Sequence, residues 1–229
     1  MLFQTASAAS LAVALLSPPV QHSTYNGQKA RKHFVTITYD WQYTHPLSFN
    51  HHPLEDLLGQ PVREVHLETF DYRTEDGSTT VDVQEFSHRN NAVGVTIYPF
   101  GSSEGTTLAI RGSIEGLPDV RLTFRGPAAP ISSYVLTNGR AYDIGVGLEV
   151  SDRSPGWGLG SHAFLLGGVG RARTDQQDGS RYFAEGGGGV TTGPLGVDIS
   201  VKVATNRFSI PASHSFLTIP VSVRGTLSF

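Results

Sequence analysis

Apolar and polar residues alternate along most of this chain, and the alternation is cleanest in the last stretch, Phe216 to Phe229. One set of alternate positions in that stretch is apolar, and the other is mostly polar. Successive side chains of a β-strand point to opposite faces, so the pattern predicts a strand with one apolar face. The strand is long enough to cross a bilayer when it is tilted. Its apolar positions include Leu217, Ile219, Val221, Val223, Leu227 and Phe229.

The same period of two recurs upstream and predicts an antiparallel, all-β chain. Turn signals separate the alternating segments, among them Gly116 to Asp119, Asn138-Gly139 and Gly193 to Gly196. We expect the Asn138-Gly139 turn to join residues 134–137 to the next strand as a hairpin. The Glu75-Asp76-Gly77 turn predicts a further, bulged hairpin that projects partly beyond the bilayer. The alternating segments are 34–43, 93–99, 106–115, 120–125, 141–150, 162–171, 181–191 and 197–204.

The number of candidate strands depends on whether residues 134–137 form a strand. The chain has twelve candidate strands with that segment and eleven without it. Single-chain bacterial barrels have an even number of strands. We therefore expect an antiparallel up-and-down transmembrane β-barrel of about ten strands, within a range of eight to twelve.

Charged residues in the middle of the clean strands occupy the positions opposite the apolar rows. In a soluble β-sandwich such residues face water, whereas in a membrane barrel they line the lumen and pair with one another. An Arg or Lys that faces lipid at the midplane costs about 2–4 kcal/mol. In a narrow barrel we expect these charges to form a closed, salt-bridged plug rather than an open pore. The candidates are Asp40, Arg111, Glu115, Arg121, Arg125, Asp143, Glu149, Glu185, Asp198, Lys202 and Arg224.

Alternation alone is typical of both a soluble sandwich and a membrane barrel. Long β-branched apolar rows, aromatic residues near strand ends, and alternately short and longer turns favour the barrel. The composition agrees, because 229 residues suit one β domain and 26 glycines suit tilted, closely packed strands. The absence of cysteine excludes a disulfide scaffold and cysteine chemistry. A net charge of −3 gives no electrostatic footprint for nucleic acid.

The C-terminal part of the chain resembles a known family. Strands 162–171 and 181–190 are Gly-rich, strand 197–204 alternates cleanly, and the last strand ends on a phenylalanine. In these features residues 141–229 resemble the small bacterial outer-membrane β-barrel proteins of the OmpA/OmpX/OmpW type. The resemblance implies a barrel in contact with outer-membrane lipid, and no particular activity. It also implies a signal for the barrel-assembly machinery, formed by Val221, Val223, Leu227 and Phe229.

The first thirty residues differ from the rest. Residues 10–16, Ser-Leu-Ala-Val-Ala-Leu-Leu, have the apolar character of a signal-peptide core, although the first basic residue is Lys29. We expect residues 1–30 to be a leader that is removed or disordered. Residues 31–229 are then expected to form a single β-barrel domain.

Two short motifs match part of a catalytic pattern, but neither meets the structural requirements of a catalytic site. Residues 101–105, Gly-Ser-Ser-Glu-Gly, match the G-x-S-x-G pattern of serine hydrolases. That mechanism requires a strand-to-helix turn, and here a strand follows, which indicates a plain turn. His214 and Ser215 are adjacent in the sequence, so on a strand they point to opposite faces and form no dyad.

Histidines gather in the first third of the chain, at His45, His51, His52 and His66. Their spacing matches no compact ligand motif, so loop histidines are the better interpretation. We expect no catalytic residue, no cofactor and no metal.

These observations predict an integral protein of the bacterial outer membrane with a structural, adhesive or narrow-channel role, not an enzyme, with other envelope proteins as partners. One alternative is an outer-membrane lipid-modifying hydrolase, similar to lipid A deacylases. It requires a Ser, a His and a carboxylate to converge on the outer wall near one rim. A second alternative is a soluble β-sandwich or lipocalin-like binder. It requires the row Val197, Ile199, Val201 and Val203 to face a core.

Overall fold

Thirteen strands and no helix make up the described part of the chain. The computed structural model describes residues 32–49, 62–66, 71–74, 80–86, 89–125, 132–152, 157–175, 177–208 and 214–229. The predicted leader, residues 1–30, lies outside the described residues. Within these ranges, no helix is long and apolar enough to cross a membrane.

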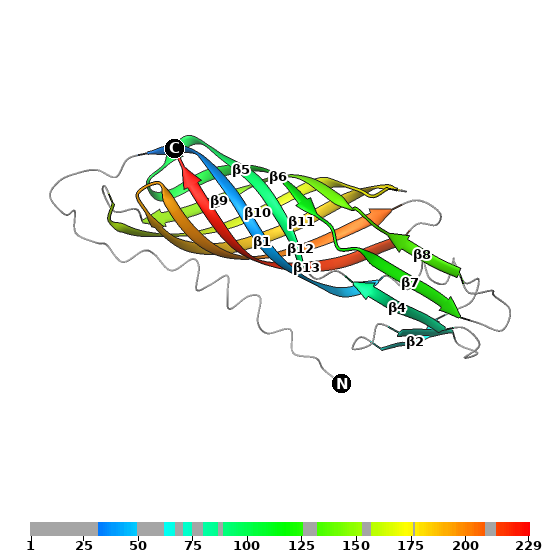
Figure 1. The fold of residues 1–229 in the computed structure, drawn as a ribbon. Helices are drawn as coiled ribbons and strands as arrows, with labels where there is room; N and C mark the ends of the chain where they lie inside the picture. Colours follow the sequence, from blue (N-terminus) through cyan, green and yellow to red (C-terminus); the bar gives the residue numbers. More distant parts are fainter. Residues whose placement is uncertain are drawn as a thin grey trace.

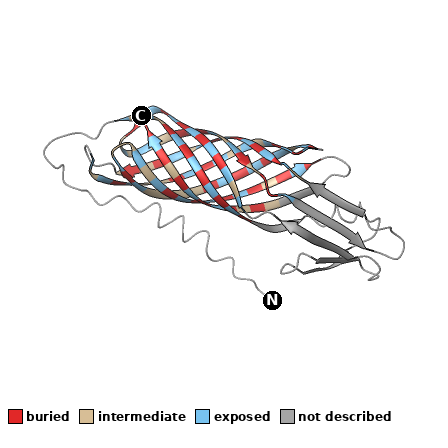
Figure 2. Cartoon of the chain, in the orientation of Figure 1, coloured by how far each residue is buried: buried red, intermediate tan, exposed pale blue. Residues whose placement is uncertain are grey.

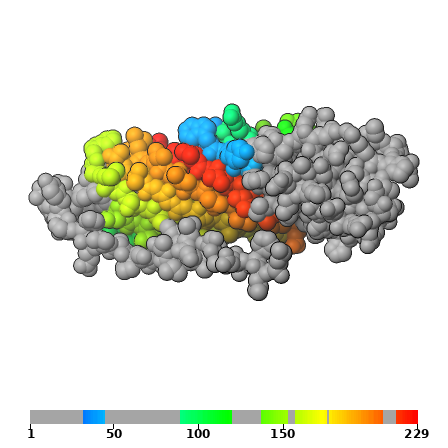
Figure 3. Space-filling model, turned by 90° about the horizontal axis from the view of Figure 1, so that it is seen from below, coloured from blue at the N-terminus to red at the C-terminus, as the bar shows by residue number. Residues whose placement is uncertain are grey.

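Eight antiparallel strands close into a barrel in the order β1-β13-β12-β11-β10-β9-β6-β5 (Figure 1). The strands are β1 (His33–Phe49), β5 (Arg89–Ser102), β6 (Glu104–Gly116), β9 (Arg140–Asp152), β10 (Leu159–Arg173), β11 (Asp178–Thr192), β12 (Leu195–Phe208) and β13 (His214–Ser228). Figure 3 shows one face of the wall, on which β12 and β13 run side by side.

The two ends of the barrel differ in how their strands are joined. At one end, here called the terminal rim, β1 begins and β13 ends, and Thr36 pairs with Ser228. Tight turns at the same rim join β5 to β6 and β11 to β12. Gly105 and Gly193 adopt positive φ angles of 84° and 55° there, a conformation that glycine accepts without strain. The opposite end, the far rim, contains Gly116, the start of β9 and the turn between β10 and β11.

First and last strands close the barrel. β1 pairs with β13 on one side and with β5 on the other. The closing seam extends to the final residue, because the Phe229 amide donates to the Val35 carbonyl at 2.8 Å and the Phe34 amide donates to the Phe229 carbonyl at 2.7 Å. Closure leaves no free edge strand in the barrel.

Five short strands form a second antiparallel sheet in the order β2-β3-β4-β7-β8. These are β2 (Val62–His66), β3 (Asp71–Thr74), β4 (Thr80–Phe86), β7 (Val120–Arg125) and β8 (Ser132–Leu136). β4 leads into β5, β7 follows β6, and β8 leads into β9, so the second sheet is attached at the far rim (Figure 1).

The barrel has eight strands, which is the lower limit of the expected range of eight to twelve and fewer than the ten at its centre. The difference has a local cause. The candidate strand at 120–125 and those within 64–89 belong to the second sheet. Residues 117–119 do not form the tight hairpin turn that we predicted, since β6 pairs with β9 and β7 pairs with β8. The predicted Asn138-Gly139 hairpin is also wrong: Asn138 adopts a φ of 53°, but the chain passes there from one sheet to the other.

Buried and exposed residues alternate along every barrel strand, which gives the wall its chequered appearance in Figure 2. The exposed positions carry the apolar rows of the sequence, and the buried positions carry polar and charged side chains. The row Val197, Ile199, Val201 and Val203 faces outward, with exposed fractions from 41% to 63%. This orientation is opposite to what the soluble-sandwich alternative requires.

Candidate functional site

Charged side chains fill the inside of the barrel. Nine of the eleven charged candidates lie on barrel strands and are buried, each with an exposed fraction of 6% or less. Because inward positions recur at every second residue, each strand contributes its polar row to one shared interior. The nine are Asp40, Arg111, Glu115, Asp143, Glu149, Glu185, Asp198, Lys202 and Arg224.

Arg121 and Arg125 are not part of this interior. Both lie on β7, in the second sheet, where they pair with Glu85 and Thr80 in backbone register. The prediction that Arg121 and Arg125 line the lumen is therefore wrong, because it assumed that their strand belongs to the barrel.

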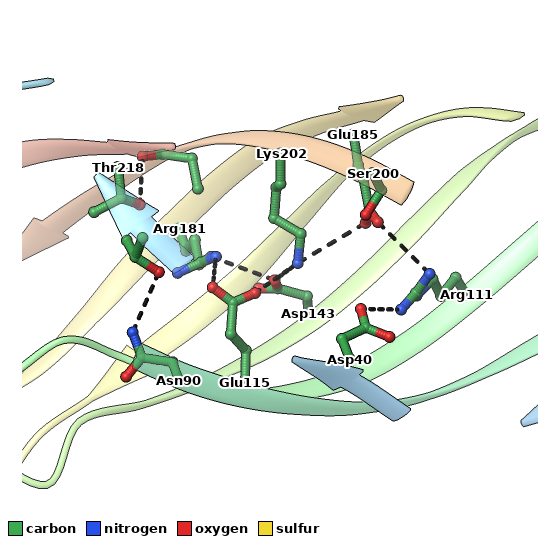
Figure 4. Close-up of polar contacts among 12 residues, drawn as sticks. Asp40, Asn90, Arg111, Glu115, Asp143, Arg181, Glu185, Ser200, Lys202 and Thr218 are labelled. Atoms are coloured by element: carbon green, nitrogen blue, oxygen red, sulfur yellow. Dashed lines mark hydrogen bonds and ion pairs between the residues drawn. The ribbon is translucent and has the colours of Figure 1, made fainter. Parts of the chain in front are cut away.

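A first ionic cluster lies on the far-rim side of the lumen (Figure 4). Arg181 binds Glu115 at 2.8 Å and approaches Asp143 at 3.3 Å. The Lys202 ammonium lies between the same two carboxylates, at 2.6 Å from Glu115 and 3.3 Å from Asp143. Arg181 also donates to the Asn206 amide oxygen at 3.0 Å. These four charges come from four different strands, so the cluster ties β6, β9, β11 and β12 together.

A second ionic cluster lies nearer the middle of the barrel. Arg224 donates to both carboxylate oxygens of Asp40 at 2.8 Å and also contacts Glu185. Arg111 binds Asp40 at 3.1 Å and approaches Glu185 at 3.6 Å. Bidentate contacts of this kind fix the guanidinium plane as well as its position.

Lys202 connects the two clusters, because its ammonium is 3.9 Å from Glu185. Together the clusters contain four acidic and four basic side chains, so their formal charges cancel. Charges that are removed from water are tolerated only when they are paired and hydrogen-bonded. The cancellation therefore explains how eight ionised groups fit inside one narrow barrel.

A third polar group lies toward the terminal rim. Tyr98 and Ser102 donate to the two oxygens of Glu149 at 2.6 and 2.9 Å. On the neighbouring side, the His162 Nε2 atom lies 3.2 Å from the Asp198 carboxylate. The buried Ser102 hydroxyl thus donates its hydrogen bond to the Glu149 carboxylate and helps to hold it in place.

Two inward phenylalanines stack against the buried cations. The Lys202 ammonium lies 5.0 Å from the centre of the Phe183 ring, and the Arg224 guanidinium lies 5.2 Å from that of Phe164. Both distances suit cation–π contacts. Glycines on adjacent strands make the room: a side chain at Gly145 would meet the Phe183 ring at 2.9 Å.

Little free space is left between these groups. A cavity of about 20 Å³ is lined by residues of several strands, among them Thr38, Arg111, His162 and Arg224. That volume holds little more than one water molecule. Eight strands enclose an interior just wide enough for side chains, so the observed filling is what the strand number predicts.

Sequence reasoning missed Arg181, which is fully buried and binds the first cluster. It follows a polar loop in the sequence and is the first residue of the predicted strand 181–191. β11 in fact begins at Asp178, which places Arg181 well inside the barrel. The signal was present, since Arg181 has the same parity as Glu185.

The remaining candidate residues take simpler positions. Residues 101–105 contain the turn from β5 to β6, with Ser103 between the two strands, and a strand rather than a helix follows. His214 and Ser215 begin β13, with backbone partners Phe208 and Arg207. The expected assembly-signal residues lie on the last strand and face outward; they are Val221, Val223, Leu227 and Phe229.

The histidine interpretation is only partly covered by the structure. His45 lies in β1 and His66 in β2, so the interpretation of these two as loop histidines is wrong. His51 and His52 lie outside the described residues. Within the described part of the chain, no group of three His, Asp or Glu side chains is arranged to hold a metal ion.

No family model matches the chain, and no curated protein is similar to it. Among solved structures, the chain is similar to the transport unit of the autotransporter AIDA-I from Escherichia coli. The match covers 96% of this chain and 97% of that one, with 11% sequence identity and a TM-score of 0.27. A likeness this weak carries no argument, so the family resemblance stays a prediction.

Proposed function

We propose that this protein is an integral β-barrel of the bacterial outer membrane with a closed lumen, and that it holds the five-stranded sheet at one membrane surface. The role is structural or adhesive. One observation carries the proposal: the barrel is polar and charged inside and apolar outside. A water-soluble barrel has the reverse arrangement, because the hydrophobic effect drives apolar side chains away from water.

The outer wall has a zone between the two rims in which the outward side chains are apolar, and this zone supports the proposal. On β9 the outward positions from Tyr142 to Val150 are Tyr, Ile, Val, Leu and Val. Nine residues with a rise of about 3.3 Å and a tilt of about 40° span roughly 23 Å, close to the apolar band of membrane barrels. Among the barrel-strand residues whose exposure is described, outward charges occur only near the two rims.

Aromatic side chains at both ends of this zone agree with it. Tyr43, Tyr142 and Tyr182 face outward near the far rim. Phe34, Phe100, Trp157 and Phe229 are exposed near the terminal rim. Amphipathic rings favour the two interfaces of a bilayer, so two such girdles fit the two membrane surfaces. Tight turns at the terminal rim suit the periplasmic side.

Gel mobility of the protein recovered from a membrane fraction tests the proposal. Samples in SDS are run with and without boiling. We expect the unboiled sample to migrate as a compact species and the boiled one to shift, since a closed barrel resists SDS until it is heated. Recovery in the soluble fraction together with an absent shift would overturn the membrane assignment.

A further inference from the structure

Outward charges differ in sign between the two ends of the barrel. The charged residues described near the terminal rim are mixed, with Lys32, Glu104 and Asp152. The far rim has more basic than acidic residues on its outer side. Its acidic residues are Asp178, which lies 3.2 and 3.8 Å from two arginines, and the exposed turn residues Asp119 and Asp175. Five outward arginines lie there: Arg89, Arg140, Arg171, Arg173 and Arg207.

Two of these arginines border a groove. An open groove of about 750 Å³ lies at the far-rim end of β5, β6 and β9. Arg89 and Arg140 line it together with Val93 and Ile114, which belong to the outward apolar rows and are each 50% exposed. The volume is in the range of small-molecule sites. The lining places positive charge at the rim and apolar surface directly below it.

The two acidic residues that line the same groove each have a polar partner other than Arg89 and Arg140. Asp175 accepts a hydrogen bond from the Asn138 amide at 2.7 Å. Glu115 is held by Arg181 and Lys202. Within the described residues, neither Arg89 nor Arg140 has an ion-pair partner.

We propose that Arg89 and Arg140 bind the phosphate of an anionic lipid whose acyl chain lies along Val93 and Ile114. The inference rests on the proposed membrane function and adds a specific lipid site to it. An arginine fork matches phosphate oxygens in geometry and charge. The ligand is a lipid of the leaflet at the far rim, because a free phosphate makes no use of the apolar lining.

The chain contains its own reporter. Trp41 faces outward on β1 and pairs with Asn91, which lines the groove. Trp157 lies at the other rim, so Trp157→Phe leaves Trp41 as the single tryptophan. We would insert this variant into vesicles of phosphatidylcholine and phosphatidylglycerol in equal parts. Two preparations are compared. In one the phosphatidylglycerol has dibrominated acyl chains, in the other the phosphatidylcholine does, and bromine quenches tryptophan fluorescence on contact.

We expect brominated phosphatidylglycerol to quench Trp41 more strongly than brominated phosphatidylcholine. The double variant Arg89→Gln, Arg140→Gln should abolish this difference in quenching. Each arginine is expected to contribute roughly a fivefold preference for phosphatidylglycerol over phosphatidylcholine. Arg207→Gln is the matched control: it removes one outward far-rim charge from β12, away from the groove, and should leave the preference unchanged.

The outcomes separate the site from the proposed function. Equal quenching by the two lipids, or an equal loss in Arg207→Gln, would overturn the lipid site and leave the membrane barrel intact. Absence of quenching by either lipid would overturn the membrane barrel, and the lipid site with it. The unboiled gel mobility of each variant verifies that it is folded.

Discussion

At the scale of single residues, the inside of the barrel depends on pairing. Arg181 is fully buried, and its neighbours Glu115 and Asp143 are nearly so. Two carboxylates and two cations share this space, so removal of one member leaves an uncompensated charge. Breaking a buried pair is much more costly than replacing the whole cluster with apolar groups.

Arg181→Met should therefore destabilise the barrel by about 3–5 kcal/mol. Arg171→Met is the control, since its side chain is 71% exposed and its ion pair with Asp178 contributes about 0–1 kcal/mol. Urea unfolding from lipid vesicles, followed by tryptophan fluorescence, measures both. Equal midpoints for the two variants would contradict the structural role of the cluster.

A second variant separates pairing from shape. Glu115→Gln added to Arg181→Met removes the charge of the carboxylate that Arg181 binds at 2.8 Å. We expect the double variant to lose less stability than the sum of the two single changes, because the residues are directly coupled. Strict additivity in a double-mutant cycle would argue against the contact.

Nine of the charged residues that lie opposite the apolar rows in the sequence are buried on barrel strands. The alternation does not predict which of these side chains form ion pairs with one another. Asp40 and Arg224 are 184 positions apart in the chain, and they meet only because β1 closes against β13. Sequence separation of that size leaves no local signal.

At the scale of elements, glycines set how closely β9, β10 and β11 approach. Gly147 lies on β9 opposite Leu166, and a Cβ atom there would collide with the Leu165 carbonyl. Gly112 on β6 has no atom within 4 Å of the same position. Both residues are strand glycines, so they form a matched pair.

Gly147→Ala should lower stability by about 1–3 kcal/mol, because backbone atoms have to move. Gly112→Ala should change it by no more than about 0.5 kcal/mol. Unfolding midpoints in the same vesicles compare the two. A destabilised Gly112→Ala beside an unaffected Gly147→Ala would contradict the described β9–β10 packing.

The last strand has two separable roles. Its backbone closes the barrel through Phe229, whereas the Phe229 side chain is 60% exposed and faces outward. We propose that this side chain belongs to the signal for the assembly machinery. Phe229→Ser should then reduce the amount of barrel assembled in cells and leave refolding of purified protein into detergent unchanged. Impaired refolding in detergent would indicate a structural role instead.

Strand positions were largely predictable from alternation, and sheet membership was not. Residues 120–125 alternate as cleanly as any barrel strand, yet β7 lies in the second sheet. Alternation with a period of two indicates that a strand has one apolar and one polar face. It carries no information about which neighbour the strand pairs with.

At the scale of the whole molecule, a filled lumen argues against the channel role. The two ionic clusters cross the interior, and a cavity that the lumen residues line beside them has a volume of about 20 Å³. We expect no discrete conductance steps when the protein is inserted into planar bilayers at neutral pH. Regular steps from the wild-type protein, absent in a mock preparation, would show that the lumen opens.

The central claim is that the apolar rows of the barrel face lipid, and a cysteine scan of β12 tests it most directly. The chain has no native cysteine, so each introduced thiol is unique. Single cysteines are placed at positions 199 to 203, labelled with an environment-sensitive fluorophore, and measured in lipid vesicles with and without brominated chains. We predict strong quenching at Ile199→Cys, Val201→Cys and Val203→Cys, and weak quenching at Ser200→Cys and Lys202→Cys. Uniformly weak quenching along the strand, in folded protein, would contradict a membrane barrel.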